Sequence, residues 1–61
     1  MNSQLVAILA AIAASQARIE GMKAENQHSE RDGDYPAYVE RHFAAEAHQL
    51  DLLSIEARNV A

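Results

Sequence analysis

The sequence predicts an all-α fold: an antiparallel two-helix hairpin that self-associates into a helical bundle. Three observations predict it. Apolar residues recur every three or four positions in two stretches, helix-breaking residues separate the stretches, and the two apolar stripes match in one antiparallel register. We expect a single domain, 1–61, with a first helix at about 3–30, a turn at 31–35 and a second helix at about 36–59.

The first predicted helix has one large-residue face and one small-residue face. Asn2 or Ser3 can cap its first turn. The face with the helical spacing of a packed seam carries Leu5, Ile8, Ile12, Ser15, Ile19, Met22 and Asn26. On the other side, Gly21 costs roughly 1 kcal/mol against Ala in a helix interior. We therefore expect another helix to approach closely there; the alternative is that the alanines merely favour helix and Gly21 is tolerated.

The turn between the helices is predicted from two residues. Gly33 can adopt the left-handed conformation that ends a helix, and Pro36 suits the first turn of a new one. Beyond them the spacing of threes and fours resumes at Val39, Phe43, Glu46, Leu50, Leu53, Ala57 and Val60.

The two seams predict their own pairing. In an antiparallel hairpin the numbers of facing residues add to a nearly constant value, and this holds from Met22 with Val39 to Leu5 with Ala57. The same register places Ser15 opposite Glu46. One interpretation is a buried acid with a raised pKa. We favour the other, a polar layer that fixes the register, with Glu46 bonded to Ser15 or reaching Arg18.

Length and composition predict self-association. A chain of 61 residues is marginal as a lone domain, and without cysteine it has no disulfide to stabilise it. Residues outside the seams would then form the oligomer face of a homodimer or larger assembly, most simply a two-fold four-helix bundle. The predicted oligomer face consists of Val6, Leu9, Ala13, Ala17, Gly21, His48, Leu52 and Ile55.

Charge and hydropathy bear on location and partners. The net charge of −4 disfavours nucleic acid and anionic membranes, which attract clustered Lys and Arg. Residues 5–14 form an apolar run, but it is half the roughly 20 residues that span a bilayer. Residues 1–4 lack the positive charge of a signal peptide. We expect a cytoplasmic protein.

The sequence offers no catalytic constellation, so we expect neither an enzyme nor a cofactor. Glu25 and His28 have the Glu-x-x-His spacing of di-iron bundles. The second helix lacks a matching pair, because Glu46 is followed three residues later by Gln49. We therefore expect no metal site, and His42 would pair with Glu46 as a surface contact.

The hairpin tip is the predicted contact region. It carries Arg31, Tyr35, Tyr38 and Arg41, residue types that often anchor binding surfaces, although the tyrosines could simply pack over the helix ends. Nearby acidic residues favour a basic partner surface. We expect a small accessory protein that binds a host protein. The alternatives are a binder or sponge for a signalling nucleotide, held between subunits, and a purely structural oligomer.

The segment 17–27, with sequence ARIEGMKAENQ, together with 37–40 and Phe43, resembles small bacteriophage and prophage open reading frames. The resemblance implies a phage-encoded protein in the host cytoplasm and carries over no activity. This chain has Tyr35-Pro36 where the pattern usually has a small polar residue. In layout alone the chain is also similar to the plasmid copy-number hairpin Rop, an RNA-binding four-helix bundle. It lacks the basic face that RNA binding requires, so a Rop-like RNA binder is a further alternative only.

Overall fold

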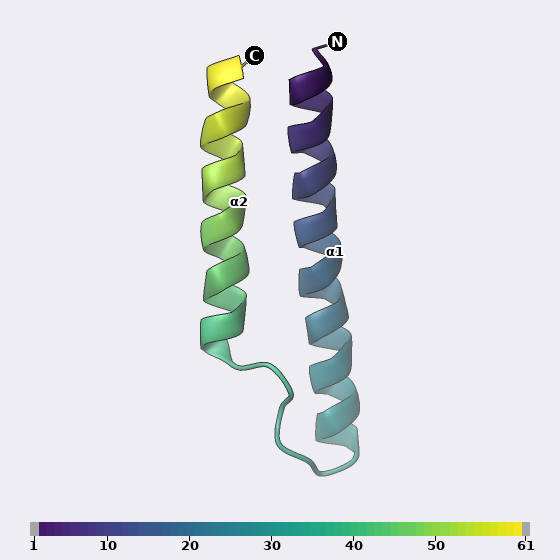
Figure 1. The fold of residues 1–61 in the computed structure, drawn as a ribbon. Helices are drawn as coiled ribbons and strands as arrows, with labels where there is room; N and C mark the ends of the chain where they lie inside the picture. The colour runs from purple at the N-terminus through teal and green to yellow at the C-terminus, as the bar shows by residue number, and fades with distance from the viewer. Residues whose placement is uncertain (1, 61) are drawn as a thin grey trace.

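The computed structural model describes residues 2–60 and shows two helices, α1 (Ser3–Arg31) and α2 (Glu40–Val60). The helices lie side by side and are joined at one end of the molecule, and the start of α1 and the end of α2 lie at the other end (Figure 1). The predicted all-α helical hairpin is confirmed. The molecule measures 47 × 18 × 9 Å, so its smallest dimension is that of a single helix.

Both ends of α1 have identifiable caps. At the start, the Asn2 side chain accepts hydrogen bonds from the backbone N–H groups of Gln4, at 2.7 Å, and Leu5, at 3.4 Å. At the end, Gly33 has a φ of 77°, its N–H donates to the Glu30 carbonyl, and the Asp34 N–H donates to the Ser29 carbonyl. These bonds form a Schellman motif, which satisfies carbonyls that the helix leaves unpaired.

The second helix begins later than expected. α2 starts at Glu40 rather than near residue 36, so Pro36 lies in a connection of residues 32–39 and not in the first turn. The cause is a long-range contact: the Asn26 side chain binds both backbone polar groups of Tyr38. Those two groups are then unavailable for a helical turn at Tyr38, and the helix begins beyond it.

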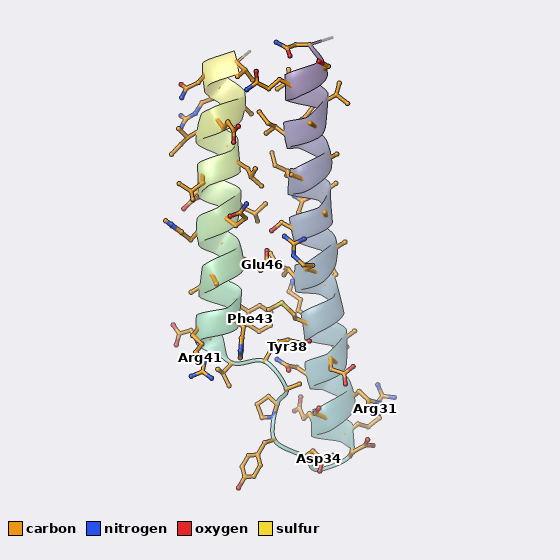
Figure 2. The ribbon with its side chains drawn as sticks, in the orientation of Figure 1. Arg31, Asp34, Tyr38, Arg41, Phe43 and Glu46 are labelled. Carbon is orange, nitrogen blue, oxygen red and sulfur yellow. The ribbon has the colours of Figure 1, made fainter. Side chains whose placement is uncertain are left out.

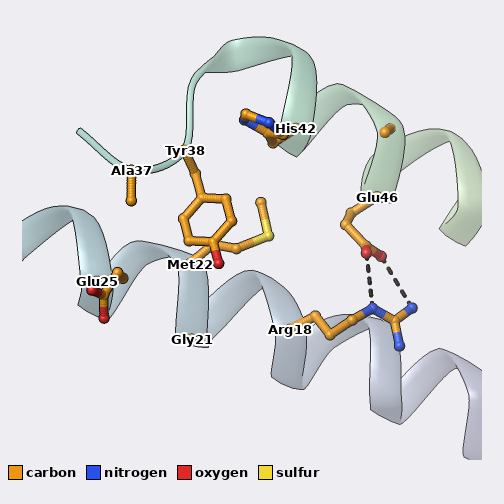
Figure 3. Close-up of a pocket in the computed structure, with 9 residues that line it drawn as sticks. Arg18, Gly21, Met22, Glu25, Ala37, Tyr38, His42 and Glu46 are labelled. Carbon is orange, nitrogen blue, oxygen red and sulfur yellow. Dashed lines mark hydrogen bonds and ion pairs between the residues drawn. The ribbon is translucent and has the colours of Figure 1, made fainter. Parts of the chain in front are cut away.

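The core is a single line of contact between the helices. Ile8, Met22 and Leu53 are buried, and Ser15 is completely buried. The other predicted seam residues are half-buried, with one exception: Leu5, Ile12, Ile19, Asn26, Phe43, Glu46, Leu50, Ala57 and Val60. The exception is Val39, which is 43% exposed. Its predicted packing opposite Met22 is wrong, because the displaced start of α2 brings Tyr38 over Met22 instead (Figure 3).

α1 carries a second signal besides its seam. By length and composition alone it is apolar enough to cross a membrane, with a mean hydropathy of 1.4 over 18 residues of which 17% are buried. A core helix of a soluble protein and a signal sequence have the same properties. Residues 5–14 alone are too short to span a bilayer, so this property belongs to the longer helix and not to the apolar run by itself.

Candidate binding groove

A polar layer joins the middle of the two helices. The Ser15 hydroxyl donates to Glu46 Oε2 at 2.6 Å. Arg18 donates to the same carboxylate through Nε, at 2.8 Å to Oε1, and through Nη2, at 3.2 Å to Oε2. Such a two-pronged contact is the strongest geometry for an Arg–carboxylate pair. The structure thus brings together Ser15, Arg18 and Glu46, the three side chains of the predicted polar layer.

The charges in this layer stabilise each other. The hydrogen bond from Arg18, and then the one from Ser15, hold the pKa of the Glu46 carboxyl below its ordinary value of 4.5, against the opposing effect of desolvation. The same bond raises the pKa of Arg18. The interpretation of Glu46 as a buried acid with a raised pKa is wrong, because the nearby guanidinium favours the charged carboxylate.

A second contact fixes the connection between the helices. Asn26 Nδ2 donates to the Tyr38 carbonyl at 2.8 Å, and the Tyr38 N–H donates to Asn26 Oδ1 at 2.9 Å. One residue later, the Val39 N–H donates to His42 Nδ1 at 2.9 Å, as a side chain three residues into a helix does in a capping box. The rings of Tyr38 and His42 meet edge to face, with centroids 5.5 Å apart.

Neither role was predicted. The available signal for Asn26 was a polar residue in an otherwise apolar seam, and for His42 it was the spacing of three from Val39. The predicted contact of His42 with Glu46 is wrong in this structure, since the Nδ1 atom serves the helix start and Glu46 is bonded to Arg18 and Ser15.

The polar layer and the Tyr38 contact enclose an open groove between α1, α2 and the connection (Figure 3). The groove has a volume of about 690 Å³. Glu25 and Ala37 lie at one end, the Arg18–Glu46 pair lies at the other, and Tyr38 and Met22 lie between them. The remaining lining residues are Gly21, His42 and Ala45. A Cβ atom added to Gly21 would meet nothing within 4 Å.

The four predicted contact residues at the tip do not form one cluster. Arg31 and Arg41 project to opposite sides of the hairpin (Figure 2). Tyr35 is 95% exposed at the end of the molecule, whereas Tyr38 is half-buried and lines the groove. Of the four, only Tyr38 belongs to a shaped site. The idea that both tyrosines pack over the helix ends is wrong for Tyr35.

The predicted oligomer face does not form one surface, and five of its eight residues fall into two groups that point opposite ways. All eight of its residues are exposed. Because Ile8, Ser15 and Met22 face α2, the residues near the back of α1 point away from that helix, and those at the back of α2 point the opposite way. We call the first group, Val6, Ala13 and Ala17, the α1 outer surface, and the second group, His48 and Ile55, the α2 outer surface. The expected close approach at Gly21 does not occur within the chain.

Two of the three histidines have partners within about one helical turn: His42 bonds to Val39, and His28 lies beside Asp32. His28 Nε2 lies 3.2 Å from Asp32 Oδ2, one helical turn away. Among residues 2–60 the structure holds no group of three His, Asp or Glu side chains placed to bind a metal ion.

Comparison of the chain with protein-family models, with curated proteins and with solved structures finds no match.

Proposed function

We propose that this chain is a small non-enzymatic binding protein, of the phage accessory type, in which antiparallel hairpins associate and present a groove to a host protein. The proposal rests on two features of the same molecule: the hairpin buries few of its residues, and it has a groove between its helices. Four residues of the described chain are buried, while Val6, Leu9, Leu52 and Ile55 are each nearly half exposed. A chain of this length that buries so few residues is marginal as a lone domain, and its exposed apolar groups support association with another protein surface.

The divided oligomer face favours a particular kind of self-association. A two-fold contact uses the same surface on both copies, and it would leave either the α1 or the α2 outer surface uncovered. Contact between the α1 outer surface of one copy and the α2 outer surface of the next covers both. Repetition of that contact closes into a ring when the rotation allows it. We therefore favour a ring of hairpins over the two-fold four-helix bundle.

The proposal is tested by gentle affinity purification of the tagged chain from a bacterial host, followed by mass spectrometry of everything retained. A host protein that co-purifies in a fixed ratio, and is lost when Tyr38 or Glu25 is replaced, supports the proposal. A chain recovered only with copies of itself indicates the purely structural oligomer. Recovery of RNA with a steep salt dependence indicates the Rop-like alternative.

A second candidate function, a binder of a signalling nucleotide, is favoured by one observation. Tyr38, which can stack on a base, and Arg18, whose Nη1 can donate to a phosphate, line the same groove. The carboxylates of Glu25 and Glu46 oppose an anion there, so this function requires cationic side chains from a second copy. A small anion retained by the purified oligomer, and released on denaturation, identifies this function.

We also propose a cytoplasmic location, although α1 is long enough to cross a membrane. If α1 spanned a membrane, Arg18 and Glu20 would lie in hydrocarbon, where each charge is costly. The Arg18–Glu46 ion pair would then lose its contact with water. Recovery of the tagged chain in the supernatant after cell breakage and high-speed centrifugation supports this location. Recovery in a membrane pellet that resists alkaline carbonate would contradict it.

A further inference from the structure

We propose that the groove receives a single basic side chain, a lysine or arginine, from the partner protein. The inference rests on the proposed function and identifies the chemistry of its partner. The alkyl part of that side chain would lie along Met22 and Gly21, and its charged end would lie between Glu25 and the Tyr38 ring.

The charges that line the groove favour a cation. The Arg18 guanidinium is engaged by Glu46 at one end, so these two charges largely neutralise each other. Glu25 lines the other end and leaves the groove, with one guanidinium and two carboxylates, at a net charge of −1. The surrounding segment 18–46 has four basic and seven acidic residues, a net charge of −3. A basic partner is attracted to this half of the molecule and an anion is repelled.

The apolar part of the groove fits a long aliphatic stem. Lysine and arginine bury their methylene groups against apolar surface and keep the charged end near water. Met22 is buried below the groove and Gly21 contributes no side chain, which leaves a channel open to solvent along α1. An aromatic ring beside the charged end adds a cation–π attraction, which Tyr38 is placed to supply.

The probe for this inference is n-butylammonium, which has the chemistry of a lysine side chain, titrated into the isotopically labelled full chain. Butyrate, of the same length and opposite charge, is the matched comparison. We expect saturable shifts of the backbone amide signals of Gly21, Tyr38 and Ala45 with butylammonium, at a dissociation constant on the order of millimolar. Butyrate should leave these signals in place.

Two variants and one control locate the binding. Gly21→Leu places a side chain in the groove, where its Cβ would meet nothing within 4 Å, and should abolish the shifts. Glu25→Gln keeps the shape and removes the charge, and should weaken binding by roughly fivefold, as expected for one partly exposed charge pair. Gln16→Leu, an exposed substitution outside the groove lining and outside both outer surfaces, should leave binding unchanged. Circular dichroism establishes that each variant remains helical.

The inference is overturned if butyrate shifts the same amides as strongly as butylammonium, if no amide shifts, or if binding survives both Gly21→Leu and Glu25→Gln. Failure of this test leaves the proposed function to its own experiment. A host protein that is lost on replacement of Tyr38 but retained by Glu25→Gln would bind the groove without a basic side chain. If the parent chain binds butylammonium but captures no host protein, the proposed function alone is contradicted.

Discussion

At the scale of single residues, Ser15 has the most confined position in the hairpin. Its side chain is completely buried and its hydroxyl donates to Glu46 at 2.6 Å. The contact between this small polar residue and Glu46 joins the two helices at this level.

Enlarging Ser15 should destabilise the hairpin more than removing its hydroxyl. Ser15→Leu overfills the contact and should lower the free energy of unfolding by about 1–3 kcal/mol. Ser15→Ala should lower it by about 1 kcal/mol, because the loss of a hydrogen bond to a charged carboxylate, about 1.5 kcal/mol, is partly offset by the better helix propensity of Ala. Urea unfolding followed by circular dichroism, at one protein concentration, measures both. Gln16→Ala, at an exposed neighbour, is the control. Equal stability of Ser15→Leu and the parent would contradict this packing.

Glu46 gives the hairpin a defined pH dependence. Its folded-state pKa is lowered, so its stabilising contribution is fully present above the ordinary pKa of 4.5 and is lost as the pH falls through the folded value. We expect the urea concentration at the unfolding midpoint to decrease as the pH falls below 4.5. Glu46→Gln should make that fall shallower. Glu20→Gln, which removes an exposed pair with Lys23, should change the profile little. Identical profiles for the parent and Glu46→Gln would exclude this role.

At the scale of the elements, the connection is held by one side chain from α1. Asn26 makes two hydrogen bonds to the Tyr38 backbone and thereby fixes the segment that leads into α2. Asn26→Ala should lower the free energy of unfolding by about 1–2 kcal/mol, and should speed hydrogen exchange of the Tyr38 amide.

Two variants separate the hydrogen bonds at Asn26. Asn26→Asp retains the acceptor for the Tyr38 N–H and loses the donor, so exchange at Tyr38 should be slower than in Asn26→Ala. Gln27→Ala, at an exposed position, should leave exchange at Tyr38 unchanged. If Tyr38 exchanges at the parent rate in Asn26→Ala, the contact does not hold the connection in solution.

The elements also show how far sequence could predict this fold. The repeating apolar spacing gave α1 and the seam, and the shared register led to Ser15 beside Glu46. Both are properties of a regular helix, where position in sequence determines position on a face. The start of α2 could not be derived in this way. It depends on a bond between Asn26 and Tyr38, which no local propensity records, and so Pro36 was placed in a helix that begins four residues later. The groove follows from that same displacement.

At the scale of the whole molecule, the hairpin is one helix thick and has two outer surfaces that face opposite ways. If the α1 outer surface of one copy contacts the α2 outer surface of the next, a charge on either surface should break the assembly. We expect Val6→Glu and Ile55→Glu each to reduce the mass measured by light scattering to that of a monomer. That mass should be the same at every protein concentration. Both side chains are nearly half exposed, so neither change disrupts the hairpin interior.

Mixing the two variants distinguishes this arrangement from a two-fold dimer. Val6→Glu retains an intact α2 outer surface and Ile55→Glu retains an intact α1 outer surface, so the mixture should form a heterodimer and nothing larger. A two-fold contact joins identical surfaces, so at least one of the two variants would then still associate by itself, and mixing would restore nothing. A parent chain that remains a folded monomer at micromolar concentration would contradict both arrangements, because the exposed apolar residues would then have no partner copy to cover them.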